Sequence, residues 1–146
     1  MFIPFINKLS ECFIYLNDDM VFTRNINRKQ FFDGNKPKST IKFIQNTNST
    51  QNRIALNSYN TIMGLEQSLD TIKSIHCPTP FNKTQMLECF NRYKSQIIAS
   101  LYQFGRSENA LSQYLYTVYD VVYYNVGKAK INNKFLFSKE SYQNFN

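Results

Sequence analysis

The 146-residue chain has no tryptophan, four glycines, four prolines and a single histidine. The shortage of glycine and proline excludes a low-complexity chain, and an aromatic content of 16% excludes an intrinsically disordered one. No run of 18 apolar residues is present, so no transmembrane segment is predicted. Lys8, Ser10 and Glu11 interrupt the apolar start of the chain, and no basic region precedes it, so no cleaved signal peptide is predicted.

The cysteines are few, and their spacing does not fit a metal site. Cys12, Cys77 and Cys89 are far apart, and one histidine is too few for a structural zinc centre. Reduced thiols of a cytoplasmic protein are the simpler interpretation.

Acidic residues are also scarce: 17 Lys and Arg face 10 Asp and Glu, for a net charge of +7. The excess concentrates between residues 24 and 53, where Asp33 is the one acidic residue. The seven basic residues of this segment are Arg24, Arg28, Lys29, Lys36, Lys38, Lys42 and Arg53. Such a segment suits phosphate, a nucleotide sugar, nucleic acid or anionic lipid, and a solvated basic loop is an equal alternative.

The pattern along the chain predicts a helix-rich α/β structure with one or two strands and three or four helices. An apolar run over residues 12–16 ends abruptly at Asn17-Asp18-Asp19. This pattern is typical of a buried strand whose C-terminal end delivers polar groups to a cleft, and a second short strand is expected over residues 20–22. A loop or irregular hairpin is expected over residues 33–54, and a terminal strand over Lys134–Phe137.

Three helices are expected after this loop. Asn57 or Ser58 can cap the first, Thr79 with Pro80 at the first helical position opens the second, and Ser107 caps a third that runs to about Asn125, before Gly127. Their apolar stripes are Ile62, Leu65, Leu69 and Ile72; Met86, Leu87, Phe90 and Ile97; and Leu111, Leu115, Val118 and Val122. The third helix also carries five tyrosines, and a helix that is apolar on most sides packs inside something larger.

Adjacent carboxylates at the end of a strand are the strongest local signal for chemistry. Asp18 and Asp19 repel one another unless a cation lies between them, and a divalent metal such as Mg²⁺ or Mn²⁺ bridging to phosphate resolves the conflict. Asn17 can bind a ligand beside them. The competing interpretation is an ordinary polar turn after a strand.

Two further positions suit phosphate. His76 precedes a segment locked by two prolines and the start of a helix, where an open anion site is expected, and Lys83 lies in the first turn of that helix. Arg106 precedes the tyrosine-rich helix and can bind phosphate oxygens. A lone histidine is more often structural than catalytic.

Together these segments resemble the Stealth family of bacterial capsular polysaccharide phosphotransferases, which are related to the eukaryotic N-acetylglucosamine-1-phosphotransferase. Residues 13–20, followed by Phe31-Phe32, resemble its second homology region. Residues 76–81, with Glu88, are similar to the His-x-Pro motif of its third region. The segment from Arg106 to Asn109 resembles a later Arg-Ser-Glu-Asp segment.

The resemblance implies transfer of a hexose 1-phosphate from a nucleotide diphosphate sugar to a hydroxyl of a polysaccharide acceptor. In that reaction Asp18 and Asp19 hold a divalent cation or orient the acceptor, His76 acts as general base or phosphate ligand, and Arg106 binds phosphate oxygens. Asn17 and Lys83 contribute to substrate binding.

The family's first region has no counterpart here, so the chain is expected to be the C-terminal portion of such an enzyme, truncated or split and inactive alone. One domain is expected over residues 1–146: the end of the second region (1–32), a basic loop (33–56), a helical part (57–127) and a tail (128–146). A separately encoded N-terminal half is then a partner, and the location is cytoplasmic, with a peripheral position at the inner membrane face. The alternative is a catalytically inactive remnant or a basic polyanion-binding module; no recognised nucleic-acid motif is present.

Overall fold

The chain is described here from a computed structural model, which defines residues 2–18, 20–22, 25–44, 50–65, 71–74, 77–102 and 111–126, with backbone alone for 42–44, 51 and 71–74. In chain order the elements are η1 (Ile3–Phe5), β1 (Cys12–Tyr15), α1 (Arg28–Phe31), β2 (Phe32–Asp33), β3 (Lys36–Pro37), β4 (Ile41–Ile44), α2 (Thr50–Met63), β5 (Thr71–Ser74), β6 (Thr79–Asn82), α3 (Lys83–Arg92), α4 (Lys94–Leu101) and α5 (Tyr114–Tyr124). The structure is mixed α/β, which confirms the predicted class.

The strands of the described residues pair in three antiparallel ladders, β1–β6, β2–β3 and β4–β5. Strands are therefore more numerous than the one or two predicted. The prediction of a second strand over residues 20–22 was wrong, because these residues follow a turn and join no ladder. Of the loop or irregular hairpin predicted over 33–54, the β2–β3 pair is a hairpin, but the range also contains β4 and the start of α2, so a basic loop over 33–56 was wrong in part.

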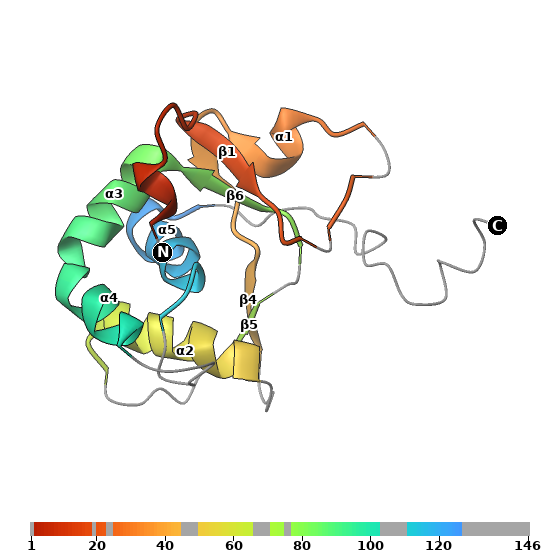
Figure 1. Cartoon of the computed structure of the whole chain (residues 1–146). Coiled ribbons are helices and arrows are strands. Elements are labelled where there is room, and N and C mark those ends of the chain that lie inside the picture. The colour runs from red at the N-terminus through yellow and green to blue at the C-terminus, as the bar shows by residue number, and fades with distance from the viewer. Residues whose placement is uncertain are drawn as a thin grey trace.

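Helix α5 forms the centre of the fold (Figure 1). Helices α2, α3 and α4 curve around it, the β1–β6 ladder covers one side, and α2 and α3 pack directly against it. Every residue from Leu115 to Asp120 is buried, so the helix is enclosed around its whole circumference. The expectation of a buried, largely apolar helix is confirmed, and this chain itself provides the enclosure.

Helix α2 differs from its prediction at both ends. It begins at Thr50 rather than near Asn57, and it stops at Met63. Gly64 has φ +66°, and the N–H of Leu65 donates to the carbonyl oxygen of Asn60 at 2.9 Å, which is the Schellman type of helix end. Ile72 therefore lies in β5 and not on the predicted helical stripe.

The next helix also begins later than expected. Thr79 and Pro80 belong to β6, and the cap of α3 is Asn82, whose side-chain oxygen accepts from the N–H of Gln85 at 3.0 Å. Of the predicted apolar face, Met86 and Phe90 are buried on α3 and Leu87 is half-buried. Ile97 is buried too, but it lies on α4, because the predicted single helix is divided at Tyr93.

The last described helix is shorter than predicted. Residues 111–113 are not helical, and α5 starts at Tyr114, where the Ser112 hydroxyl oxygen accepts from the N–H of Tyr114 at 3.2 Å. Asn125, with φ +46°, ends the helix before Gly127 is reached. Gly127 and the predicted strand Lys134–Phe137 lie outside the described residues.

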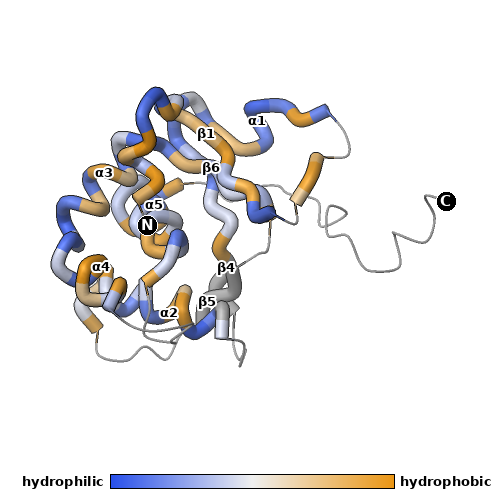
Figure 2. Tube along the Cα trace, in the orientation of Figure 1, coloured by the Kyte–Doolittle hydropathy of each residue, from blue (hydrophilic) through white to orange (hydrophobic). Residues whose placement is uncertain are grey.

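No helix in the described ranges combines the length and the apolar character needed to cross a membrane. Coloured by hydropathy, the described helices alternate between hydrophobic and hydrophilic positions (Figure 2).

Candidate functional site

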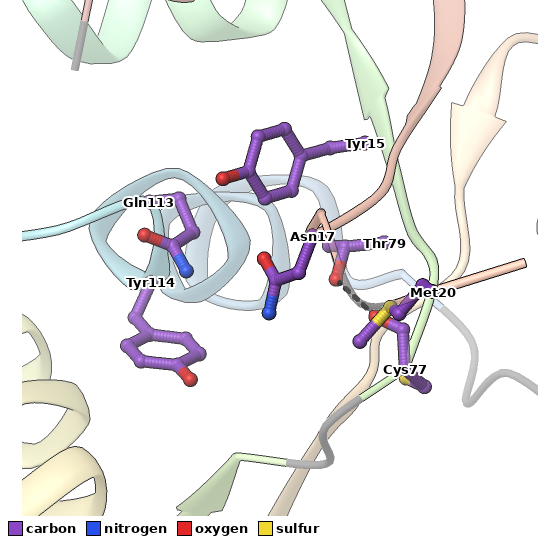
Figure 3. A pocket seen from close by; sticks show the side chains of 7 residues that line it. All are labelled: Tyr15, Asn17, Met20, Cys77, Thr79, Gln113 and Tyr114. Carbon is purple, nitrogen blue, oxygen red and sulfur yellow. Dashed lines mark hydrogen bonds between the residues drawn. The ribbon is translucent and has the colours of Figure 1, made fainter. Parts of the chain in front are cut away.

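A small hollow lies where β1 ends (Figure 3). Its cavity volume is about 10 Å³, room for roughly one water molecule, and it opens to solvent. The side chains that line it are Tyr15, Asn17, Met20, Cys77, Thr79, Gln113 and Tyr114. They come from three separate stretches of the chain. The first two stretches lie within the family-like motifs of residues 13–20 and 76–81, and the third follows the segment 106–109, which lies outside the described residues.

The pairing of β1 with β6 explains why two of these stretches meet. In this antiparallel ladder Tyr15 lies opposite Thr79, so the chain leaving β1 and the chain entering β6 emerge at the same end. Asn17 therefore comes beside Cys77, the residue that follows His76 in sequence. The first turn of α5 supplies Gln113 and Tyr114 from a third direction.

A turn occupies the segment with the adjacent carboxylates. The N–H of Met20 donates to the carbonyl oxygen of Asn17 at 3.0 Å, which closes a four-residue turn. Asn17 is half-buried with its amide in the hollow, whereas Asp18 is exposed at the next position. Asp19 lies outside the described residues. The predicted turn geometry is thus present, together with one amide that faces the hollow.

Cys77 closes the hollow on its inner side. Burial raises the pKa of its thiol to about 12, although a hydrogen bond with the Thr40 side chain opposes the shift. The thiol is therefore protonated near neutral pH and is a poor nucleophile. The Thr79 hydroxyl donates to the Cys77 carbonyl oxygen at 3.1 Å, which holds the backbone of this segment (Figure 3).

The polar groups of the hollow are neutral hydrogen-bonding side chains. Tyr15, Asn17, Gln113 and Tyr114 surround one space and come from β1, the turn after it and the start of α5 (Figure 3). Amides and phenols both donate and accept, so this arrangement can bind hydroxyl groups of a sugar or oxygens of a phosphate.

Of the other predicted site residues, His76 and Arg106 lie outside the described residues, as Asp19 does. Lys83 is described, and it lies away from the hollow. It follows Asn82, which pairs with Cys12 at the opposite end of the β1–β6 ladder, roughly 10 Å along the strands from the Tyr15–Thr79 pair. Asn17 and Lys83 are therefore not brought together.

The prediction of an open anion site at the helix after His76 was wrong. The first N–H groups of α3 are already bonded within the chain. The backbone carbonyl oxygen of Glu11 accepts from the N–H of Lys83 at 2.7 Å, and the Glu11 carboxylate accepts from the N–H of Thr84 at 3.3 Å. The Asn82 side-chain oxygen accepts from the N–H of Gln85. An acidic side chain thus occupies the place where a bound anion was expected.

Among the described residues at the hollow, Asn17, Asp18 and Gln113 carry side-chain oxygens that could bind a divalent cation. These are the hard oxygen donors that Mg²⁺ prefers. Within the described ranges no three His, Cys, Asp or Glu side chains come together as a metal site.

Sequence reasoning identified Asn17 but missed Tyr15, Thr79, Gln113 and Tyr114. Tyr15 and Thr79 become neighbours through strand pairing, which leaves no local signal. Gln113 reaches the hollow through the placement of α5, which is also a long-range feature with no local signal.

A second concentration of ionisable groups lies between α3 and α5, away from the hollow. Tyr124 donates a hydrogen bond to the Glu88 carboxylate, and the Arg92 guanidinium lies 4.5 Å from the centre of the Tyr123 ring. Asp120 is 3% exposed, and burial first, then the charge of Glu88, raises its pKa well above the usual value. Burial likewise raises the pKa of the Cys89 thiol.

Comparison with known proteins gives no family: neither the protein-family models nor the curated proteins match this chain.

Proposed function

We propose that the hollow at the end of β1 is part of a sugar-phosphate transfer site. The supporting observation is the convergence of the turn after β1, the segment that follows His76 and the start of α5. The three motifs that resemble the Stealth phosphotransferases lie in or next to these segments.

In the proposed reaction a hydroxyl of a glycan attacks the phosphorus that carries the sugar of a nucleotide diphosphate sugar. The sugar 1-phosphate joins the acceptor oxygen, the bond to the nucleotide breaks, and a nucleoside monophosphate leaves. Catalysis of this kind depends on positioning and on neutralising phosphate charge. Asn17 would orient the sugar or the acceptor in the hollow. His76 would take the proton of the hydroxyl, and Arg106 would bind phosphate oxygens.

A divalent cation would supply charge neutralisation for the phosphates. The oxygens of Asn17, Asp18 and Asp19 are the groups that would hold it. The proposed location is the cytoplasm, where the chain would work at the inner face of the membrane on a capsule or other surface polysaccharide. Lys83 is left out of the reacting centre, because it lies at the far end of the ladder.

Donor binding gives a direct test. Thermal unfolding of the chain with UDP-N-acetylglucosamine and Mn²⁺ should show a raised melting temperature, since a ligand that binds the native state stabilises it. Asn17→Ala should remove that rise. Asn91→Ala, an exposed asparagine on α3, should retain it. Equal rises in the two variants would contradict a role for the hollow.

Turnover requires its own assay. Release of nucleoside monophosphate with a glycan acceptor is measured for the chain alone and for the chain mixed with the N-terminal half of a Stealth protein. His76→Ala and Arg106→Ala should each reduce turnover at least ~100-fold, with melting temperatures within a few degrees of the parent. Donor binding without release under both conditions would favour the inactive remnant.

A further inference from the structure

Four cations gather on one small unit at the edge of the molecule. The unit comprises α1 and the β2–β3 hairpin, residues 25–38, and the basic face is defined here as Arg28, Lys29, Lys36 and Lys38. Arg28, Lys29 and Lys36 are exposed and Lys38 is half-buried. Asp33 is the unit's one acidic residue, opposite Lys36 across the hairpin.

The fold holds these charges in place. The Arg28 guanidinium donates to the Asn35 side-chain oxygen at 3.0 Å and lies 5.4 Å from the centre of the Phe32 ring. The Lys38 ammonium donates to the carbonyl oxygen of Lys29. Phe31 and Phe32, each 5% exposed, anchor the unit in the interior. Two of the four cations, Arg28 and Lys38, are thus held in place by hydrogen bonds within the unit. A local excess of positive charge of this kind favours an anionic partner.

Exposed apolar side chains border the basic face. Val21 is 63% exposed and Ile26 is 38% exposed. Ile26 lies immediately before Asn27, the cap of α1. Val21 adjoins Phe22, whose ring centre lies 6.2 Å from that of Phe31 on α1. Figure 2 shows the hydrophobic segment 20–22 and the start of α1 on the same side of the molecule.

This combination distinguishes between anionic partners. Single-stranded nucleic acids bind where basic groups accompany exposed aromatic rings, yet the two aromatic rings of the unit are buried. Cations bordered by exposed aliphatic side chains are typical of proteins that bind the surface of an anionic bilayer.

We propose that the basic face, bordered by Val21 and Ile26, binds the headgroups of anionic phospholipids and holds the chain at a membrane surface. The four cations would bind the lipid phosphates, and the two aliphatic side chains would enter the interface. The proposal rests on the peripheral location suggested above and identifies the surface responsible. Vesicle binding needs no turnover, so this proposal and the transfer reaction can fail separately.

The test is co-sedimentation of the full chain with vesicles of phosphatidylcholine, with and without phosphatidylglycerol. Binding should require phosphatidylglycerol and weaken with added salt. Lys29→Gln and Lys36→Gln should each weaken the partition by about 5-fold, the usual contribution of one basic residue near such a surface. Lys94→Gln removes the same charge from α4 and should change the partition much less. Ile26→Ser should weaken vesicle binding but leave binding of soluble polyphosphate unchanged.

Equal binding to neutral vesicles would overturn the proposal, and so would equal losses in Lys94→Gln and Lys29→Gln, which would indicate an effect of net charge alone. Tight binding of polyphosphate combined with vesicle binding that is insensitive to Ile26→Ser would assign the face to a soluble polyanion instead.

Discussion

At the scale of single residues, Asp120 shows how a buried acid makes stability depend on pH. Its carboxyl group lies inside the fold, and burial with the nearby Glu88 charge raises its pKa. The folded chain therefore keeps this proton at pH values where the unfolded chain, with a pKa of about 3.9, has lost it. The contribution of Asp120 to stability is fully present below that unfolded pKa and is lost as the pH rises toward the folded pKa.

Asp120→Asn should therefore stabilise the protein at neutral pH. The amide has nearly the same shape and cannot ionise, so the loss of stability above about pH 4 should disappear from the profile. Each unit by which the pKa is raised corresponds to about 1.4 kcal/mol. The measurement is the melting temperature of parent and variant between about pH 4 and about pH 8. Asp33→Asn changes an exposed carboxyl of the hairpin and should retain the parental dependence of melting temperature on pH. A lower melting temperature for Asp120→Asn than for the parent at neutral pH would contradict the raised pKa of Asp120.

At the scale of the elements, apolar periodicity predicted the faces of the later helices well, but it predicted the face of α2 and the helix ends poorly. Of the first stripe, Ile62 is buried, Leu65 is 44% exposed and Ile72 lies in β5. Met86, Phe90, Ile97, Leu115 and Val118 are buried as predicted, because a stripe reports which side of a helix meets the core. The position of a helix end depends on a single capping residue, and several neighbouring residues in the sequence could serve as the cap equally well. Chain pairing favoured β6 over a helix at Thr79, and the backbone conformation of Gly64 ended α2.

Asn82 is the cap whose two functions can be separated. Its side-chain oxygen accepts from the N–H of Gln85, and its amide nitrogen donates to the carbonyl oxygen of Asn35 at 3.2 Å, which links α3 to the hairpin. Asn82→Ala removes both bonds and should lower the free energy of unfolding by about 1–2 kcal/mol. Asn82→Asp keeps the acceptor for the cap and loses the donor, so it should recover part of that loss in a denaturant titration. Identical stabilities of the two variants would show that the cap contributes nothing.

The candidate site was predictable only where its signal was local. Asn17 follows an abrupt end of an apolar run, and that contrast marks a strand end in the sequence itself. Thr79 and Gln113 join the hollow through the β1–β6 pairing and the placement of α5, both of which are long-range features. The same limit explains why Lys83 was grouped with Asn17: distance along a ladder depends on its register.

At the scale of the whole molecule, α5 links the parts of the fold. It packs against α2 and α3, and the Tyr116 ring meets the Phe81 ring of β6 with centres 6.3 Å apart. The sequence suggested that so apolar a helix needs a larger body around it, and an isolated chain was expected to expose hydrophobic surface. In the structure, helices and a ladder from this same chain surround it. Because α5 packs against α2, α3 and β6, we expect these elements to unfold together with it.

Leu115→Ala should therefore weaken the whole fold and not one region of it. Leu115 is fully buried on α5, and removing such a side chain typically costs about 2–5 kcal/mol because a cavity remains. Leu101→Ala, at a half-exposed position on α4, should cost much less and serves as the matched control.

The chain has ten tyrosines and no tryptophan, so near-ultraviolet circular dichroism reports tyrosine packing, and far-ultraviolet circular dichroism reports the helices. In the parent both signals should be lost in one transition, and in Leu115→Ala both should shift to lower temperature by the same amount. Separate transitions for the two signals, or strong binding of a hydrophobic dye by the folded parent, would show that the chain does not enclose α5 by itself.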